Sequence, residues 1–154
     1  MSLGTPRNQG FGLLDLMIAV VILSLLAAVA VPSYKQFVVR AKNAKAIGDI
    51  GSIAIQIDKY RLNNNQALPP TLNALPIDIP LDPWGTPYQY LILVGGANLG
   101  DSRKDGKLVP INSDYDLWSY GDDGQSSTPL TAKVSRDDIV RANNGAYVGL
   151  GEDY

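Results

Sequence analysis

The chain has 154 residues, of which 45% are hydrophobic, and a formal net charge of −2 at pH 7. So small a net charge provides no basic field for nucleic acid. The sequence contains no cysteine and no histidine, which excludes a disulfide framework, a thiolate metal site, a thiol nucleophile and a Ser/His/Asp triad. Its length predicts one domain with a modest core.

The longest apolar stretch lies near the N-terminus, at residues 11–31. Its only plainly polar members are Asp15 and Ser24. A helix of about 20 apolar residues spans a bilayer core of about 30 Å. We therefore predict one membrane-spanning helix at the N-terminus, with the rest of the chain built outward from it.

A short polar leader precedes this helix. Residues 1–10 carry Arg7 and end in Gly10. A secretory signal peptide is cleaved after its apolar region, whereas cleavage between Gly10 and Phe11 would create an amino-terminal cation ahead of the helix. A carboxylate in a membrane span is costly unless it is paired. Asp15 therefore either reaches the water at the headgroups or pairs with that cation of a neighbouring chain.

This arrangement resembles the class III prepilins, which comprise the type IV pilins and the pseudopilins of type II secretion. In that family a leader ends in Gly, Phe follows, and the apolar helix has an acid at its fifth position, as Gly10, Phe11 and Asp15 do here. The family acid is usually Glu rather than Asp, and the second mature residue is usually Thr, where this chain has Gly12. The resemblance implies that prepilin peptidase cleaves after Gly10 and methylates Phe11, and that Asp15 acts in assembly.

An amphipathic pattern continues beyond the membrane segment. Between residues 34 and 60, apolar side chains recur at three- and four-residue spacing, which is the stripe of a helix that packs on one face. We predict one long helix over about residues 11–62. It ends at a polar cluster of Asn63, Asn64 and Asn65.

Basic residues gather just after the membrane segment. By the positive-inside rule alone, they favour a cytoplasmic C-terminal domain. The resemblance implies the opposite orientation, a single pass through the bacterial inner membrane with residues 32–154 in the periplasm, and we adopt it because the leader pattern is specific. The basic residues are Lys35, Arg40, Lys42 and Lys45.

Strand composition appears in the second half of the chain. Residues 88–94 and 115–120 are rich in aromatic and branched side chains, and residues 107–111 form a weaker candidate. We predict an α+β, pilin-like fold in which about three antiparallel strands lie across the C-terminal half of the long helix. The tail, residues 149–154, is expected to be mobile.

Two further segments narrow the resemblance. Residues 82–90 read DPWGTPYQY, and residues 116–125 read DLWSYGDDGQ, with DDIV following at residues 137–140. In this order they closely resemble the major pseudopilin of type II secretion. The resemblance implies a subunit that polymerises helically through residues 11–31 into a periplasmic pseudopilus, with minor pseudopilins and an inner-membrane assembly platform as partners.

The resemblance also implies a calcium site in the C-terminal loop. Calcium takes six to eight oxygens from carboxylates and carbonyls. The family match gives carboxylates to Asp123 and Asp138 and carbonyls to Tyr120 and Gln125. The loop is longer than is usual in the family, so Asp137 is an alternative to Asp138. Asp122 is a further alternative ligand, and all these acids could instead be solvated turn and cap residues.

Three other functions remain open. A type IV pilin for adhesion, twitching or DNA uptake often has a C-terminal disulfide, which a chain without cysteine lacks. A minor tip pseudopilin usually lacks the loop acids. A membrane-anchored hydrolase could use a carboxylate pair such as Asp122 and Asp138, but a domain this small offers little room for a cleft, so we expect a structural protein and not an enzyme.

Overall fold

The computed structural model describes residues 12–154. Gly10 and Phe11 therefore lie outside the described residues. The chain divides into two compact units, one that ends at Val39 and one that comprises Arg40–Tyr154. We describe each unit by itself.

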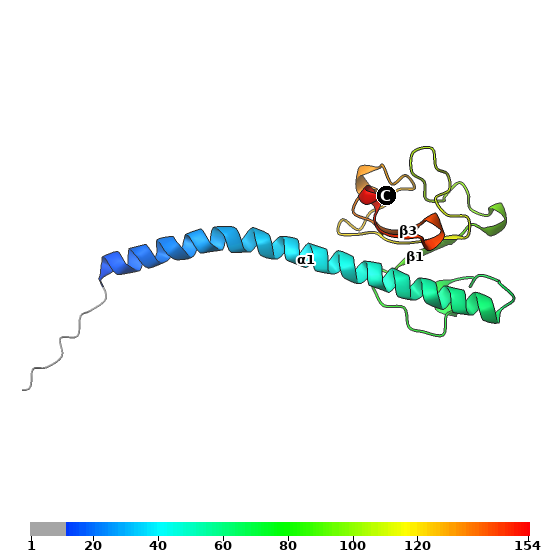
Figure 1. Ribbon diagram of the computed structural model, residues 1–154, viewed down its shortest axis with the longest axis horizontal. Coiled ribbons are helices and arrows are strands. Elements are labelled where there is room, and N and C mark those ends of the chain that lie inside the picture. The colour runs from blue at the N-terminus through cyan, green and yellow to red at the C-terminus, as the bar shows by residue number, and fades with distance from the viewer. Residues whose placement is uncertain (1–11) are drawn as a thin grey trace, which may run out of the picture. The chain divides into compact units, whose positions relative to one another are not determined.

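The single long helix of the prediction is confirmed as α1 (Leu13–Asn63), which contributes residues to both units (Figure 1). It ends where the asparagine cluster begins. The side-chain amide of Asn64 donates to the carbonyl of Tyr60 at 2.8 Å, and Asn65 adopts a left-handed φ of 53°. Carbonyl groups at a helix C-terminus lack partners within the helix, and the Asn64 amide satisfies one of them. The left-handed Asn65 turns the backbone away from the helix axis.

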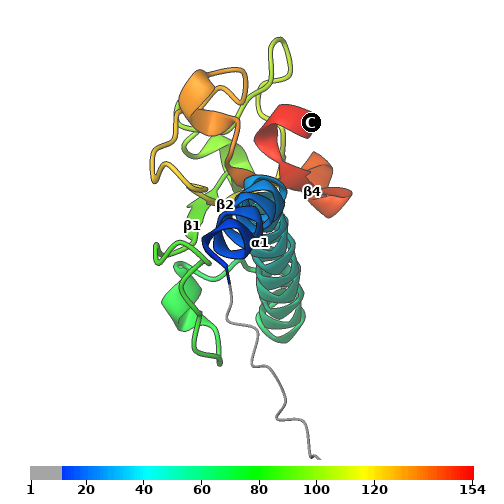
Figure 2. The same cartoon turned by 90° about the vertical axis from the view of Figure 1, so that its left-hand side faces the viewer.

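A four-stranded antiparallel sheet lies along the C-terminal part of α1 (Figures 1 and 2). Its strand order follows the sequence, so each strand pairs with its neighbour in the chain. The strands are β1 (Gln89–Ile92), β2 (Tyr115–Ser119), β3 (Ile139–Ala142) and β4 (Tyr147–Leu150). Short 3-10 helices connect them: η1 (Leu72–Ala74), η2 (Val94–Gly96), η3 (Lys133–Ser135), η4 (Asn143–Gly145) and η5 (Gly151–Asp153).

The sheet corrects the prediction of about three strands. The first two predicted strands are confirmed, but residues 107–111 form no strand and contribute only an isolated bridge between Leu108 and Asp105. The last two strands were missed because their short sequences, IVRA and YVGL, include arginine, alanine or glycine and form no run of aromatic and branched side chains. The prediction of a mobile tail was also wrong, because β4 and η5 give this segment regular structure.

The core of the second unit lies between α1 and one face of the sheet. The helix contributes buried residues at the predicted three- and four-residue spacing. Their partners on the sheet alternate along each strand, as the pleat requires. The helix residues are Ala46, Ile50, Ile53 and Ile57, and the main sheet residues are Tyr115, Leu117 and Ile139.

The opposite face of the sheet is covered by loops. A second, smaller cluster there contains Ile111, Leu130, Val140 and Ala142. Ile111 and Leu130 come from the two long loops that precede β2 and β3. Consequently the alternation within β2 and β3 directs one set of side chains to the helix and the other to these loops.

The DPWG segment is a turn tied to the sheet through Asp82. One oxygen of the Asp82 carboxylate accepts the backbone N–H groups of Trp84 and Thr86 at 3.1 and 2.8 Å. The other accepts the hydroxyls of Thr86 and Ser119, each at 2.5 Å. Asp82 is thus a structural residue that connects this turn to the end of β2.

Candidate functional site

The N-terminal part of α1 has the length and apolarity of a membrane span. Its most apolar window of 18 residues has a mean hydropathy of 2.8, and it is the one helix among the described residues that meets both criteria. Large apolar side chains cover all sides of this segment. Exposed examples are Leu13, Leu16, Ile18, Leu23, Leu26 and Val29. A helix that is apolar all round must be buried in lipid or against other helices.

Asp15 lies in the first turn of this helix. Its carboxylate accepts the backbone N–H of Gly12 at 3.0 Å, which satisfies one of the free N–H groups at a helix N-terminus. This bond occupies one carboxylate oxygen. The predicted partner of Asp15, the ammonium group of Phe11, lies outside the described residues, so the pairing stays a prediction.

The acids of the C-terminal loop fall into two groups, one that forms hydrogen bonds within an exposed turn and one that forms a buried ion pair. Asp137 accepts the backbone N–H groups of Asp122 and Asp123, at 2.9 and 3.0 Å. Asp123 accepts the N–H of Gln125 at 2.7 Å. Asp122, Asp123 and Gln125 are exposed. These hydrogen bonds therefore shape an exposed turn.

Asp138 is buried, with a fully inaccessible side chain, on the loop-covered face of the sheet. It forms an ion pair with Arg103, whose side chain is only 3% exposed, and it accepts the hydroxyl of Ser126 at 2.6 Å. Burial raises the pKa of Asp138 to about 6, although the hydrogen bond from Ser126 and the charge of Arg103 oppose the rise. At neutral pH the group is an anion that needs a buried cation.

The carboxylates of the predicted calcium ligands each have one oxygen engaged by another group. Within residues 12–154, no group of three or more acidic side chains lies close enough together to hold a metal ion. One oxygen of Asp138 accepts from Arg103 and Ser126, and one oxygen of Asp123 accepts the N–H of Gln125. Tyr120 is half-buried and packs edge-on to Trp118, with ring centroids 6.4 Å apart. Because the guanidinium of Arg103 already supplies the cation beside Asp138, the residues around Asp138 do not fit a calcium ion in addition.

Sequence reasoning missed Arg103. It lies in the loop between η2 and β2, in the segment DSRKDGK, whose composition is that of a solvated turn. Neither periodicity nor a motif marks it. Only its position opposite Asp138 in the folded chain distinguishes it from the neighbouring basic residues.

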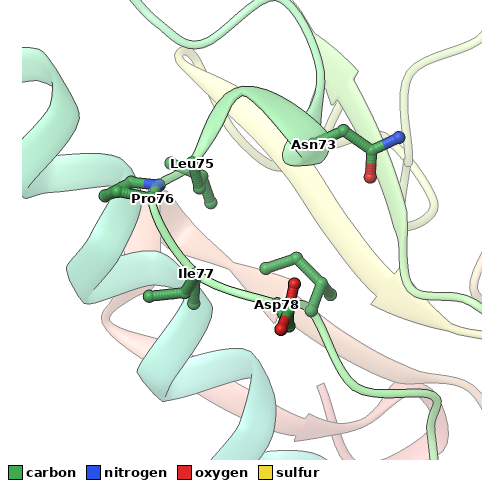
Figure 3. Close-up of a pocket in the computed structure, with 6 residues that line it drawn as sticks. Asn73, Leu75, Pro76, Ile77 and Asp78 are labelled. Carbon is green, nitrogen blue, oxygen red and sulfur yellow. The ribbon is translucent and has the colours of Figure 1, made fainter.

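Neither acid of the predicted hydrolase pair, Asp122 and Asp138, lines the surface hollow at residues 73–79. This hollow has a volume of about 560 Å³, and Figure 3 shows its lining. Asp78 is the single charged residue among those that line it. The pair that a hydrolase would need, Asp122 and Asp138, is divided between an exposed turn and a buried ion pair.

Comparison with known proteins points to protein secretion. The prokaryotic N-terminal methylation motif matches residues 5–31. The chain is 35% identical over 136 residues to type II secretion system core protein G of Pseudomonas aeruginosa. The alignment covers 74% of this chain and 96% of the relative. Core protein G of Dickeya chrysanthemi is 32% identical over 163 aligned positions, 92% of each chain. That of Escherichia coli is 31% identical over 144, with coverage of 80% and 88%. No solved structure gave a significant match.

Proposed function

Because the chain belongs to the family of type II secretion system core protein G, the major pseudopilins, we propose that it polymerises into a periplasmic pseudopilus that drives protein export. Its family gives it a pseudopilin role in secretion. We infer in addition that the chain polymerises, that it has a defined orientation in the membrane, and that it acts with an assembly platform and minor pseudopilins. This role is structural and needs no catalytic residue.

The observation that carries the proposal is the apolar surface of residues 13–31. Any sufficiently apolar helix can serve as a single membrane anchor. In a filament the same side chains leave the lipid and pack against the corresponding helices of other subunits. An all-round apolar surface such as that of α1 suits both environments.

The processing step rests on the leader and the matched motif. Prepilin peptidase cleaves between Gly10 and Phe11 and methylates the new terminus. The methylation motif covers both residues. The ammonium group of Phe11 then pairs with Asp15 of a neighbouring subunit, which compensates the cost of a carboxylate in an apolar bundle.

The location follows from this processing. Before assembly, the chain spans the inner membrane once, with residues 32–154 in the periplasm. The assembly platform extracts it, and minor pseudopilins share the filament. The basic residues after the membrane segment favour the opposite orientation, so orientation needs its own measurement. A reporter enzyme fused after Tyr154 that is active only in the periplasm provides it.

Complementation tests the proposed function. A type II secretion strain that lacks its own core protein G is supplied with this chain, and the secreted fraction of an exoprotein is measured. A photo-crosslinking amino acid at Leu16, which is exposed, reports assembly at the same time. We expect crosslinked multimers that require the rest of the assembly machinery. Multimers that form equally without the machinery, or crosslinks to lipid alone, would contradict polymerisation.

A further inference from the structure

Residues 121–138, which connect β2 to β3, form a long loop with few apolar anchors. Leu130 is buried, at 2% exposure, and Val134 is half-buried. Most other residues of the loop are small or polar. Ordering so many residues costs conformational entropy that two apolar side chains do not offset. Some other interaction must hold this loop in place.

Arg103 contacts this loop at two places, its C-terminal end and an internal stretch at residues 126–127. One terminal nitrogen of the guanidinium pairs with Asp138, at the C-terminal end. The other donates to the hydroxyl of Ser126 and, at 2.7 Å, to the carbonyl of Ser127. A planar guanidinium with several donors suits such a bridge better than a lysine would.

Arg103 is itself firmly positioned. Its backbone N–H donates to the carboxylate of Asp116 in β2 at 2.7 Å. Its guanidinium carbon lies 5.3 Å from the centre of the Trp118 ring. Asp116 and Trp118 alternate with the residues that face α1, so both point to the loop-covered face. The sheet therefore presents the cation to the loop.

The residue after Arg103 extends the same junction through its backbone. The N–H of Lys104 donates to the carbonyl of Thr128 at 3.0 Å, and the N–H of Leu130 donates to the carbonyl of Lys104 at 2.8 Å. Lys104 and Pro129 form an isolated parallel bridge between the two segments. The Arg103 segment thus supplies both charge and backbone pairing to the loop.

A calcium ion at this place would compete with the guanidinium. Asp138 retains one oxygen without a partner among the described residues, whereas calcium needs six to eight. A divalent cation beside a buried guanidinium would also be repelled. We propose that Arg103 is the built-in cation that orders residues 121–138, and that this loop folds without bound calcium.

The first test uses the full-length wild-type chain in detergent micelles. Hydrogen exchange of residues 121–138 is measured by mass spectrometry in EDTA and in calcium chloride at about 1 mM, the weak end of the range for extracellular calcium sites. Titration calorimetry with calcium chloride accompanies it. We expect exchange rates that agree within about twofold and no stoichiometric binding. A tenfold slower exchange in calcium, or one bound ion per chain, would overturn the proposal.

The second test removes the cation. Arg103→Met should accelerate exchange in residues 121–138 at least tenfold, in EDTA and in calcium alike. Arg136→Met is the matched control, because Arg136 is an exposed arginine of the same loop, and its exchange should match the wild type. Wild-type protection in Arg103→Met would show that the guanidinium does not order the loop.

The third test separates charge from packing. In Arg103→Met the carboxylate of Asp138 is left buried and unpaired, which is costly. Adding Asp138→Asn removes that charge and should recover at least threefold of the lost protection. Equal exchange in the single and double variants would refute the charge role. None of these measurements requires assembly or secretion, so they stand apart from the proposed function, and the wild-type calcium test stands even where a variant fails to fold.

Discussion

Arg141 on β3 forms a bidentate ion pair with Asp114, the residue just before β2. The two N···O distances are 2.9 and 2.8 Å, and the guanidinium carbon lies 3.9 Å from the centre of the Tyr115 ring. A third hydrogen bond runs from Arg141 to the carbonyl of Tyr115 at 3.0 Å. This pair therefore fixes the start of β2 to β3. Burial alone would raise the pKa of Asp114, but the hydrogen bonds from Arg141 and the backbone, with the charge of Arg141, hold it below its ordinary value.

The Asp114–Arg141 pair predicts a component of acid sensitivity. Because the pKa of Asp114 is lower in the folded chain than in the unfolded chain, its contribution to stability is present above the unfolded value of 3.8. It is lost as the pH falls through the folded value. Asp114→Asn should lower the free energy of unfolding by about 1–3 kcal/mol at neutral pH. Its difference from wild type in thermal melts should shrink as the pH falls below 3.8.

The exposed Asp101 provides the control for this prediction. Asp101→Asn should leave the melting temperature nearly unchanged at every pH. A difference between wild type and Asp114→Asn that is constant with pH would mean that ionisation of Asp114 does not contribute.

The helical half of the fold was readable from the sequence because its signals are long. The apolar run and the stripe that includes Ile50, Ile53 and Ile57 each extend over many residues, and both are confirmed in α1. By contrast, β3 and β4 combine a length of four residues with sequences, IVRA and YVGL, that form no run of aromatic and branched side chains. At that length a strand is specified by its neighbours in the sheet rather than by its own composition.

The loop acids show where sequence reasoning stops. The sequence placed Asp137 and Asp138 side by side and left both as candidate ligands. Alternation along the chain separates their roles. Asp138 lies on the same face as Val140, under the loops, whereas the carboxylate of Asp137 accepts a hydrogen bond from the turn at Asp122. The partner of Asp138 is separated from it by 35 residues, and such a pairing has no local signature.

Asp82 is expected to be critical for the second unit although it is far from the membrane helix. Asp82→Ala leaves four donors from Trp84, Thr86 and Ser119 without their acceptor. Loss of a buried, multiply bonded carboxylate should lower the free energy of unfolding by about 2–4 kcal/mol. Urea unfolding in detergent, followed by tryptophan fluorescence, measures it.

The exposed Asp78 is the matched control for Asp82. Asp78→Ala should change the free energy of unfolding by less than about 0.5 kcal/mol. Equal effects of the two substitutions would argue that the Asp82 hydrogen bonds are not retained in solution.

Asp15 should matter for assembly and not for insertion. Asp15→Ala removes an acid from an apolar helix and so should leave membrane insertion intact. If the carboxylate pairs with the Phe11 ammonium group of a neighbour, the same variant should form few filaments. Asp15→Glu should assemble at least as well as wild type. Carbonate extraction measures insertion, and sheared-filament yield measures assembly; wild-type yield from Asp15→Ala would rule out the pairing.

Two glycines in the turn at residues 121–124 give a sharp test of the loop's structure. Gly121 and Gly124 have the same left-handed φ of 65°, which disfavours any residue with a Cβ. They differ in surroundings. A Cβ on Gly121 would lie 2.3 Å from the carbonyl oxygen of Asp137, whereas no atom of the described chain lies within 4 Å of a Cβ on Gly124. The two positions therefore share the conformational cost and differ in the contact.

Alanine at each of these glycines should separate the two effects. Gly124→Ala carries only the left-handed penalty and should cost about 1–2 kcal/mol of unfolding free energy. Gly121→Ala adds a clash with backbone that has little room to move, worth about 1–3 kcal/mol more. Hydrogen exchange should also show the Asp122 and Asp123 amides, which donate to Asp137, losing protection in Gly121→Ala alone. If both variants lose the same stability and protection, the backbone of Asp137 does not lie against the turn.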